Sequence, residues 1–192
     1  MRVRVYYDFA STLCYVAHRV FGAMDDELAA LGVALDWLPL DLADLLGWPR
    51  RVEVEAARLS NAERVAAEHG VDVRPLRIWP DSRDANAAAL ILAKGPHAAA
   101  WRERVFSAAF EERRALDAPG AVEAFARDLG VALEPRALAR ARDELEFRTR
   151  IAAEEDVTGV PTLMLGDFPF GGIQSRETTR LVLERWLRRT RL

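Results

Sequence analysis

The sequence has very few of the residues that bind metals or exchange disulfides. Its 192 residues include one cysteine, Cys14, and three histidines. A single cysteine excludes an internal disulfide, a Cys-x-x-Cys redox pair and a cysteine-rich zinc site. Neither His69 nor His97 has acidic residues at a spacing typical of metal ligands, so no metal is expected.

An excess of one charge and long apolar stretches are also lacking. Lysine and arginine together number 27, aspartate and glutamate 30, which gives a net charge of -3. This balance gives no electrostatic reason to expect a nucleic-acid partner. No apolar run approaches the ~18 residues of a membrane span, so no membrane partner is expected. Residues 1–5 enter a strand pattern without the apolar core of a signal peptide, and we expect a cytoplasmic protein.

The first forty residues predict a strand, a helix and a second strand. Apolar residues alternate over residues 3–9, which is typical of a strand. Ser11 is a suitable N-cap for a helix whose apolar positions recur over residues 13–31, and Gly32 is placed to end it. Residues 33–38 predict the second strand. Because a helix connects the two strands, a parallel pair is expected.

The middle of the chain is helical, and strand patterns return at its end. The expected helices, separated by glycine and proline, cover residues 61–69, 84–113 with a break at 95–96, 121–129 and 135–155. Strands are expected at residues 160–165 and 168–170, followed by a helix that begins at Ser175 or Glu177. The order is therefore β-α-β, a helical insertion, then β-β-α.

Two motifs near the ends of the chain resemble those of one family. Residues 8–15 read Asp-Phe-Ala-Ser-Thr-Leu-Cys-Tyr and resemble the Asp-Phe-x-Cys-Pro-x-Cys-Tyr active site of DsbA-like oxidoreductases of the FrnE type. Residues 159–162, Gly-Val-Pro-Thr, are similar to the Gly-Val-Pro-Thr of that family, in which the proline is cis. Residues 80–86 and 110–125 resemble helices of its inserted domain.

This resemblance implies an α/β protein with a thioredoxin-like fold. Residues 1–40 and 156–192 would form the thioredoxin-like domain, and residues 41–155 an inserted all-helical domain. The kappa-class glutathione transferases and the 2-hydroxychromene-2-carboxylate isomerases share the fold and the insertion. Their active site reads Ser-Pro-Tyr-Ser, and its first serine hydrogen-bonds the glutathione sulfur. Residues 11–14 read Ser-Thr-Leu-Cys. The first position matches the serine of these enzymes, and the last position matches the second cysteine of the oxidoreductases.

Ser11 and Cys14 are the candidate catalytic residues. A serine hydroxyl cannot exchange a disulfide, but it can donate a hydrogen bond to an external thiolate above a helix N-terminus. Ser11 alternatively serves only as a helix cap. Cys14 is either a small buried apolar residue or a reactive monothiol, and His18 follows it at i+4 on the same face.

The candidate cofactor-binding residues are Val160, Pro161, Gln174 and Ser175. In the family, the backbone before the cis-proline binds the peptide part of a thiol. Relatives that use glutathione hold its γ-glutamyl end with a serine-aspartate pair near the last helix. Here Arg176 follows Ser175 and the aspartate is absent. The alternative is an ordinary loop and helix cap.

The resemblance and the residues together predict a protein that acts on thiols. The first hypothesis is a thiol-dependent isomerase or transferase in which Ser11 stabilises the thiolate of glutathione or another low-molecular-weight thiol. The second is a monothiol disulfide oxidoreductase that uses Cys14, and the third is a non-catalytic module that binds a peptide or a thiol. The expected partner is a small-molecule or peptide thiol substrate. Kappa-class relatives are often dimers, so a homodimer is one assembly to test.

Overall fold

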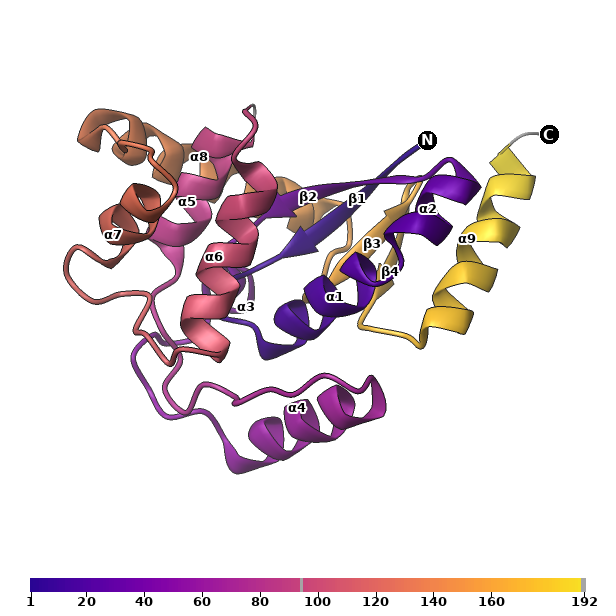
Figure 1. Ribbon diagram of the computed structural model, residues 1–192, viewed down its shortest axis with the longest axis horizontal. Coiled ribbons are helices and arrows are strands. Elements are labelled where there is room, and N and C mark those ends of the chain that lie inside the picture. Colours follow the sequence, from indigo (N-terminus) through magenta and orange to yellow (C-terminus); the bar gives the residue numbers. More distant parts are fainter. Residues whose placement is uncertain (94, 191–192) are drawn as a thin grey trace.

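A four-stranded mixed sheet forms the centre of the protein (Figure 1). The computed structural model describes residues 1–93 and 95–190. The strands are β1 (Arg2–Tyr7), β2 (Ala34–Pro39), β3 (Thr162–Leu165) and β4 (Phe168–Gly171), in the order β2-β1-β3-β4. β1 is parallel to β2 and antiparallel to β3, and β3 is antiparallel to β4. The expected parallel pair and the thioredoxin-like α/β fold with a helical insertion are confirmed.

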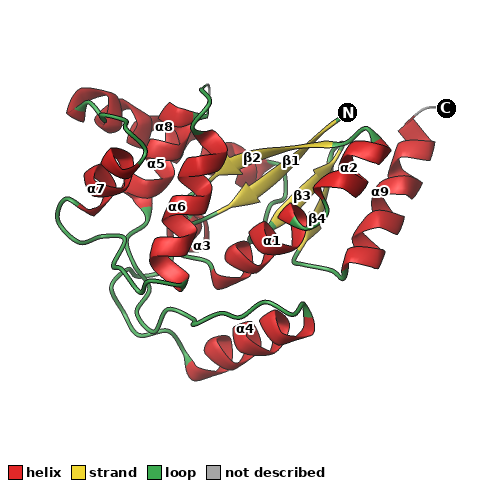
Figure 2. Cartoon of the chain, viewed as in Figure 1, coloured by secondary structure: helices red, strands yellow, loops and turns green. Residues whose placement is uncertain are grey.

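Helices cover both faces of this sheet (Figure 2). Helices α1 (Thr12–Gly22), α2 (Asp25–Leu31) and α9 (Arg176–Thr190) pack on one face, against Val3, Val5 and Leu163. Helix α3 (Leu42–Leu46) and the end of α8 (Pro135–Glu154) pack on the other face, around Tyr6 and Met164. Because successive side chains of β1 point to opposite faces, Val3 and Val5 enter one core and Tyr6 enters the other.

The chain between β2 and β3 is helical where the structure describes it. It contains α3 and α8 together with α4 (Ala56–Glu68), α5 (Arg83–Leu92), α6 (Ala98–Phe110) and α7 (Ala121–Asp128). Its core is built from large buried side chains such as Trp101, Phe106 and Phe125. Phe9 and Cys14 belong to the same cluster, so the start of α1 is packed directly against the insertion.

The helices differ from the prediction in three details. The expected helix over residues 13–31 is two helices, because α1 ends at Gly22 and α2 begins at Asp25. Asp25 and Asp26 stand in the first turn of α2, where negative charge favours a helix start. The helix expected at residue 61 begins at Ala56, and the short helix α3 was not predicted.

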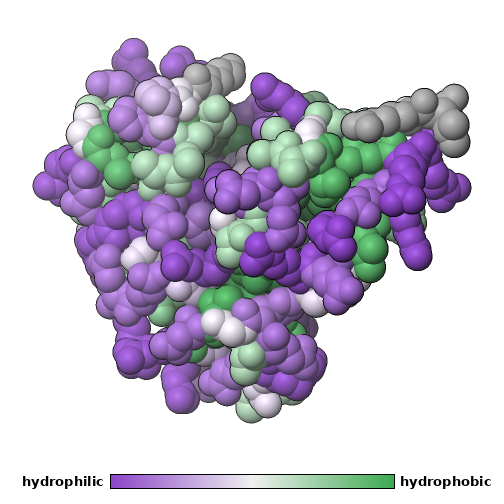
Figure 3. All heavy atoms as spheres, turned by 45° about the vertical axis from the view of Figure 1, so that its right-hand side comes forward, coloured by the Kyte–Doolittle hydropathy of each residue, from purple (hydrophilic) through white to green (hydrophobic). Residues whose placement is uncertain are grey.

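Helix α4 and the chain on either side of it form an arm beside α1 (Figure 1). The two ends of this arm are held together by backbone hydrogen bonds. Arg51 N–H donates to Trp79 O at 2.7 Å, and Trp79 N–H donates to Val52 O at 2.8 Å. Figure 3 shows mainly hydrophilic side chains over this side of the molecule, with apolar surface in the crease just above the arm.

No helix among the described residues combines the length and the apolar composition needed to cross a bilayer.

Candidate functional site

Ser11 caps the N-terminus of α1 and leaves hydrogen-bond donors free at that end. Its backbone is extended, with φ -88° and ψ 115°, and its hydroxyl oxygen accepts the N–H of Cys14 at 3.3 Å. The hydroxyl donates no hydrogen bond of ordinary geometry to any described residue, although it lies close enough to the Cys14 sulfur to lower the pKa of that thiol. The backbone N–H groups of Thr12 and Leu13, in the first turn of α1, also have no hydrogen-bond partner among the described residues. Three donors are therefore available to an anion at the start of α1.

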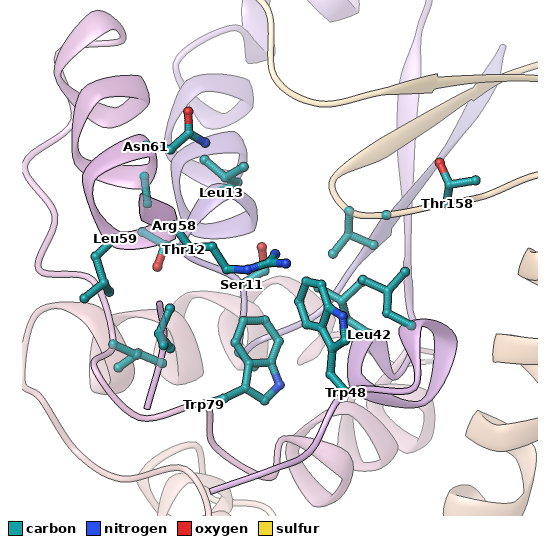
Figure 4. Close-up of a pocket in the computed structure, with 17 residues that line it drawn as sticks. Ser11, Thr12, Leu13, Leu42, Trp48, Arg58, Leu59, Asn61, Trp79 and Thr158 are labelled. Carbon is teal, nitrogen blue, oxygen red and sulfur yellow. The ribbon is translucent and has the colours of Figure 1, made fainter. Parts of the chain in front are cut away.

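These donors face a pocket of about 430 Å³ that lies between the body of the protein and the α4 arm (Figure 4). Its walls are mainly apolar. The residues that line it from the body are Ala10, Ser11, Thr12, Leu13, Leu42, Leu46, Trp48, Thr158, Gly159 and Val160. The arm contributes Val54, Arg58, Leu59, Asn61, Ala62, Leu76 and Trp79. Ser11 and Val160, which are predicted site residues, thus lie on the same pocket.

Cys14 lies in the same turn of the helix but points into the core. Its side chain is 0% exposed, and it packs with Tyr7, Phe9 and Tyr15. Burial raises the pKa of the Cys14 thiol to about 12, although the side chain of Ser11 and the backbone of Asp8 partly oppose this rise. A thiol with so high a pKa is protonated at neutral pH and is a poor nucleophile.

Beneath Ser11, a buried carboxylate connects three segments. Asp8 is 0% exposed. Its Oδ1 accepts the N–H of Ala10 at 2.8 Å and the hydroxyl of Ser82 at 2.6 Å, while Oδ2 accepts the N–H of Leu42 at 2.7 Å. Ala10 and Leu42 both line the pocket. Asp8 therefore fixes the turn before Ser11 relative to the starts of α3 and α5.

The far wall of the pocket holds one cation and two indoles. The guanidinium of Arg58 lies 4.1 Å from the ring centroid of Trp48, a cation–π contact. Trp48 and Trp79 meet edge to face with centroids 5.4 Å apart. Figure 4 shows Arg58 reaching across the pocket from α4 towards Trp48 and the Ser11 end of α1. Its pairing with Glu55 is loose, at 3.5 Å, so the cation remains available to a ligand.

The chain before β3 forms the side of the pocket opposite α4. The peptide bond between Val160 and Pro161 is cis. The Thr162 hydroxyl donates to Gly159 O at 2.8 Å, and Gly172 N–H donates to Pro161 O at 2.8 Å, which pins the loop on both sides. The backbone N–H and C=O of Val160 have no partner among the residues that the structure describes. They are available to an extended ligand backbone.

The structure does not bring Gln174 and Ser175 into this pocket. Ser175 lines a separate hollow beside Tyr15 and accepts the N–H of Thr178 at 3.1 Å, as a helix cap does. Gln174 O accepts the Thr179 hydroxyl at 3.5 Å. Their expected place beside a thiol bound at Ser11 has no support in this geometry.

His18 does not hydrogen-bond Cys14. Its Nε2 lies 2.7 Å from Glu103 Oε2, and its ring stacks on Phe106 at 5.3 Å. The Nε–H of Arg102 donates to His18 Nδ1 at 3.4 Å. Burial is the main cause of the lowered pKa of His18. This places His18 in a structural cluster between α1 and α6.

Two residues of the site were missed in the sequence. Arg58 stands among other charged residues of α4, and no local pattern separates it from a solvent-exposed arginine. Asp8 follows an apolar strand at the point where a helix begins, a position typical of buried functional carboxylates. That position is a signal that could have found Asp8.

Comparisons with known proteins agree with this architecture. The chain is similar to 2-hydroxychromene-2-carboxylate isomerase, with 23% identity and a TM-score of 0.76 over 99% of this chain and 98% of that one. The chain is also similar to a probable DsbA oxidoreductase from Streptomyces coelicolor, with 20% identity and a TM-score of 0.74 over 97% of this chain and 90% of that one. A third similar structure is the cytosolic disulfide reductase DsbM from Pseudomonas aeruginosa, solved with GSH. It has 18% identity and a TM-score of 0.66 over 98% of this chain and 100% of that one.

At these identities the solved structures show a shared fold, and no curated protein matches the sequence. The family itself is shown by a broader comparison. The model of the DSBA-like thioredoxin domain matches residues 2–183, which is nearly the whole chain. The chain therefore belongs to the DSBA-like thioredoxin family, whose members described above are oxidoreductases and an isomerase.

Proposed function

We propose that this protein is a thiol-dependent isomerase or transferase in which Ser11 stabilises the thiolate of a bound low-molecular-weight thiol. The observation that carries the proposal is the division of roles at the start of α1. The free hydroxyl of Ser11 faces the pocket, while Cys14, the one cysteine of the chain, is sealed in the core. The protein thus presents donors for a thiolate and no accessible thiol of its own.

The free donors are sufficient to activate a thiol. A hydrogen bond from Ser11 to a thiolate is charge-assisted and contributes about 1.5–3 kcal/mol. The helix N-terminus, with the N–H groups of Thr12 and Leu13, adds about 0.3–1 kcal/mol. Because one pKa unit corresponds to about 1.4 kcal/mol, together they lower the pKa of a bound thiol by about 1–3 units. A thiol of ordinary pKa, about 8.5, is then about a quarter ionised at pH 7 if the shift is 1 unit, and largely ionised if it is about 2 units or more.

Of the other residues of the pocket, some would contact the thiol and the rest would contact the substrate with which it reacts. When bound, the thiol would supply the nucleophilic sulfur that adds to an electrophilic carbon and, in an isomerisation, leaves it again. The backbone of Val160, which has no partner among the described residues, would hold the peptide part of the thiol. Trp48 and Trp79 offer apolar surface, and Arg58 a positive charge, to an apolar or aromatic substrate that carries an anionic group.

Glutathione is the first thiol to test. The neighbour DsbM was solved with GSH, and the isomerase neighbour is named for an aromatic carboxylate, which fits the two halves of the pocket. The separate position of Ser175 weakens the case for a glutathione γ-glutamyl site of the familiar kind. The route through Cys14 is disfavoured because its thiol is buried and protonated.

The proposal is tested by measuring the ionisation of the bound thiol. In a Cys14→Ala background the protein has no cysteine, so the ultraviolet absorbance of thiolate reports only on the ligand. We expect saturable binding of reduced glutathione, with an apparent thiol pKa at least about 1 unit below its free value. Adding Ser11→Ala should raise that pKa again. Binding of S-methylglutathione, which has no thiol, should change little in Ser11→Ala.

Each other result has a definite meaning. If glutathione does not bind, it is not the thiol of this protein. If it binds with an unshifted pKa, the pocket is a binding module without thiol activation. If Cys14→Ala abolishes turnover that Ser11→Ala leaves intact, the monothiol reaction at Cys14 replaces this proposal.

A further inference from the structure

A second hollow lies outside the Ser11 pocket and is lined by four arginines. It measures about 460 Å³, within the range of small-molecule sites. Arg74 and Arg77 approach it from the chain that follows α4, and Arg113 and Arg114 from the chain that follows α6. We call this hollow the arginine groove. Leu76 lines both the arginine groove and the Ser11 pocket, so the two share a wall.

Most of the positive charge of the arginine groove is unpaired within the part of the chain that the structure describes. Arg74, Arg77 and Arg113 form no ion pair with any residue that the structure describes. Arg114 is partly engaged: its guanidinium lies 4.7 Å from the ring centroid of Phe125 and makes long ion pairs, 3.6 Å to Glu112 and 4.0 Å to Asp128.

The acidic residue of the groove, Asp117, is already engaged. Its Oδ2 lies 3.0 Å from Arg51 Nε and accepts the N–H of Asp81 at 3.3 Å. A chain of net charge -3 therefore carries a local excess of positive charge at a concave site. Several guanidinium groups around one hollow are suited to a ligand with more than one negative charge.

The backbone on both sides of the arginine groove is held in place. Arg77 O accepts the N–H of Val54 at 2.8 Å, within the paired segments that close the α4 arm. On the other side, Arg114 N–H donates to Ala108 O at 2.8 Å. Arg113 has a φ of 58°, a left-handed conformation that is unusual for a residue other than glycine. The guanidinium groups are thus attached to a fixed frame, which reduces the entropic cost of binding.

We propose that the arginine groove binds an organic phosphate, with its phosphate groups on the arginines and its apolar part against Leu76 and Ile78. Guanidinium groups match phosphate oxygens in bidentate geometry, and one small ligand brings several charges into a hollow of this size. Ile78, which is 49% exposed, gives the groove an apolar wall that inorganic phosphate would not need. An acidic peptide offers charges spread along an extended chain, which fits a hollow of this small volume less well. The proposal is independent of the thiol chemistry at Ser11.

Calorimetric titration with adenosine diphosphate, pyrophosphate and adenosine tests this at low ionic strength, where exposed charges are least screened. We expect saturable binding of adenosine diphosphate, weaker binding of pyrophosphate and none of adenosine. Arg77→Gln and Arg113→Gln should each weaken binding of the diphosphate by about tenfold or more. Arg140→Gln is the matched control, because this exposed arginine of α8 has the same charge and lies outside the groove.

Five results would overturn the proposal, and the first four concern the arginine groove itself. The first is that binding of adenosine diphosphate does not saturate at about 1 mM. The second is that pyrophosphate binds as tightly as adenosine diphosphate, and the third is that Arg140→Gln weakens diphosphate binding as much as the groove variants do. The fourth is that a hexaglutamate peptide binds and the diphosphate does not. A loss of diphosphate binding in Arg58→Gln, with Arg77→Gln unaffected, would also overturn it by placing the ligand in the Ser11 pocket. Unchanged melting temperatures of the variants show that they remain folded.

Discussion

The hydroxyl of Ser82 donates a 2.6 Å hydrogen bond to the carboxylate of Asp8, which lies 74 residues earlier in the chain and is completely buried. No arginine, lysine or histidine among the described residues pairs with this carboxylate. Burial raises the pKa of Asp8, and its hydrogen bonds from Ser82, Ala10 and Leu42 oppose that rise. The network joins the insertion to the turn that presents Ser11, so the pocket depends on contacts made by both parts of the chain.

Replacing Asp8 tests whether this network holds the site together. Asp8→Ala leaves the N–H groups of Ala10 and Leu42 and the hydroxyl of Ser82 without their acceptor, and each unsatisfied buried group costs about 1–3 kcal/mol. We expect the free energy of unfolding, measured by urea denaturation, to fall by about 3 kcal/mol or more. Asp36→Ala removes the same charge from β2 at a partly exposed position and should cost much less. Equal losses in the two variants would contradict the role of the network.

The burial of Cys14 predicts that it resists alkylation. With its pKa raised to about 12, the thiolate fraction at pH 8 is roughly a thousandfold lower than for a free thiol of pKa about 8.5. We expect iodoacetamide to modify native Cys14 at least about a thousandfold more slowly than the same protein unfolded in urea. Mass spectrometry after timed quenching measures both rates. Rapid modification of the native protein would restore Cys14 as a candidate nucleophile.

The sequence predicted those parts of the fold that depend on local patterns. The period of two along β1, the N-cap at Ser11 and the left-handed Gly32 are each set by neighbouring residues, and the structure agrees with them. The break within residues 13–31 was missed because the apolar spacing continues across Met24, which is itself fully buried. Periodicity cannot show a change in helix direction when both helices bury the same face.

The candidate site was predicted only where a motif carried it. Ser11 and Val160 were named from short motifs at the two ends of the chain, and they line one pocket. Arg58 was not named, because its contact with Trp48 and its approach to α1 come from the folding of the insertion over the site. Ser175 was named by analogy, and it lies in a different hollow. Contacts between distant segments are decided by tertiary packing, which a single sequence does not display.

The cluster around His18 predicts a loss of stability in mild acid. Nδ1 accepts from Arg102, so the ring proton lies on Nε2 and faces Glu103. Burial and the charges of Arg102 and Arg19 lower the pKa of His18 below its ordinary 6.5, and Glu103 opposes them in part. The unfolded chain therefore takes up this proton more readily than the folded chain does. The contribution of His18 is fully present above pH 6.5 and is lost as the pH falls below it.

Urea denaturation at several pH values measures this effect. The decline due to His18 is at most about 1.4 kcal/mol per pH unit, and it should be absent in His18→Gln, whose side chain does not titrate. The difference in the free energy of unfolding between wild type and variant should thus shrink as the pH falls from 7 to about 5. A difference that stays constant over this range would show that His18 does not titrate differently in the two states.

Arg58 predicts a preference for anionic ligands in the Ser11 pocket. Its guanidinium lies over Trp48 and is half exposed, with 50% of the side chain accessible, so it contributes little to folding but can meet a carboxylate. We expect Arg58→Gln to weaken binding of cinnamate by about tenfold, because a charge-assisted hydrogen bond is lost. Binding of cinnamamide, which has the same ring and no charge, should be unchanged. Quenching of tryptophan fluorescence measures both, since Trp48 and Trp79 line the pocket.

Arg64→Gln provides the matched control for Arg58→Gln. Arg64 belongs to the same helix and is 61% exposed, but it pairs with Glu68 and does not line the pocket. Its replacement removes the same charge from α4 and should alter neither cinnamate nor cinnamamide binding. If both arginine variants weaken cinnamate equally, the effect arises from the general field of α4 and not from contact with Arg58. If cinnamamide weakens as much as cinnamate in Arg58→Gln, the residue supports the Trp48 ring and does not recognise the anion.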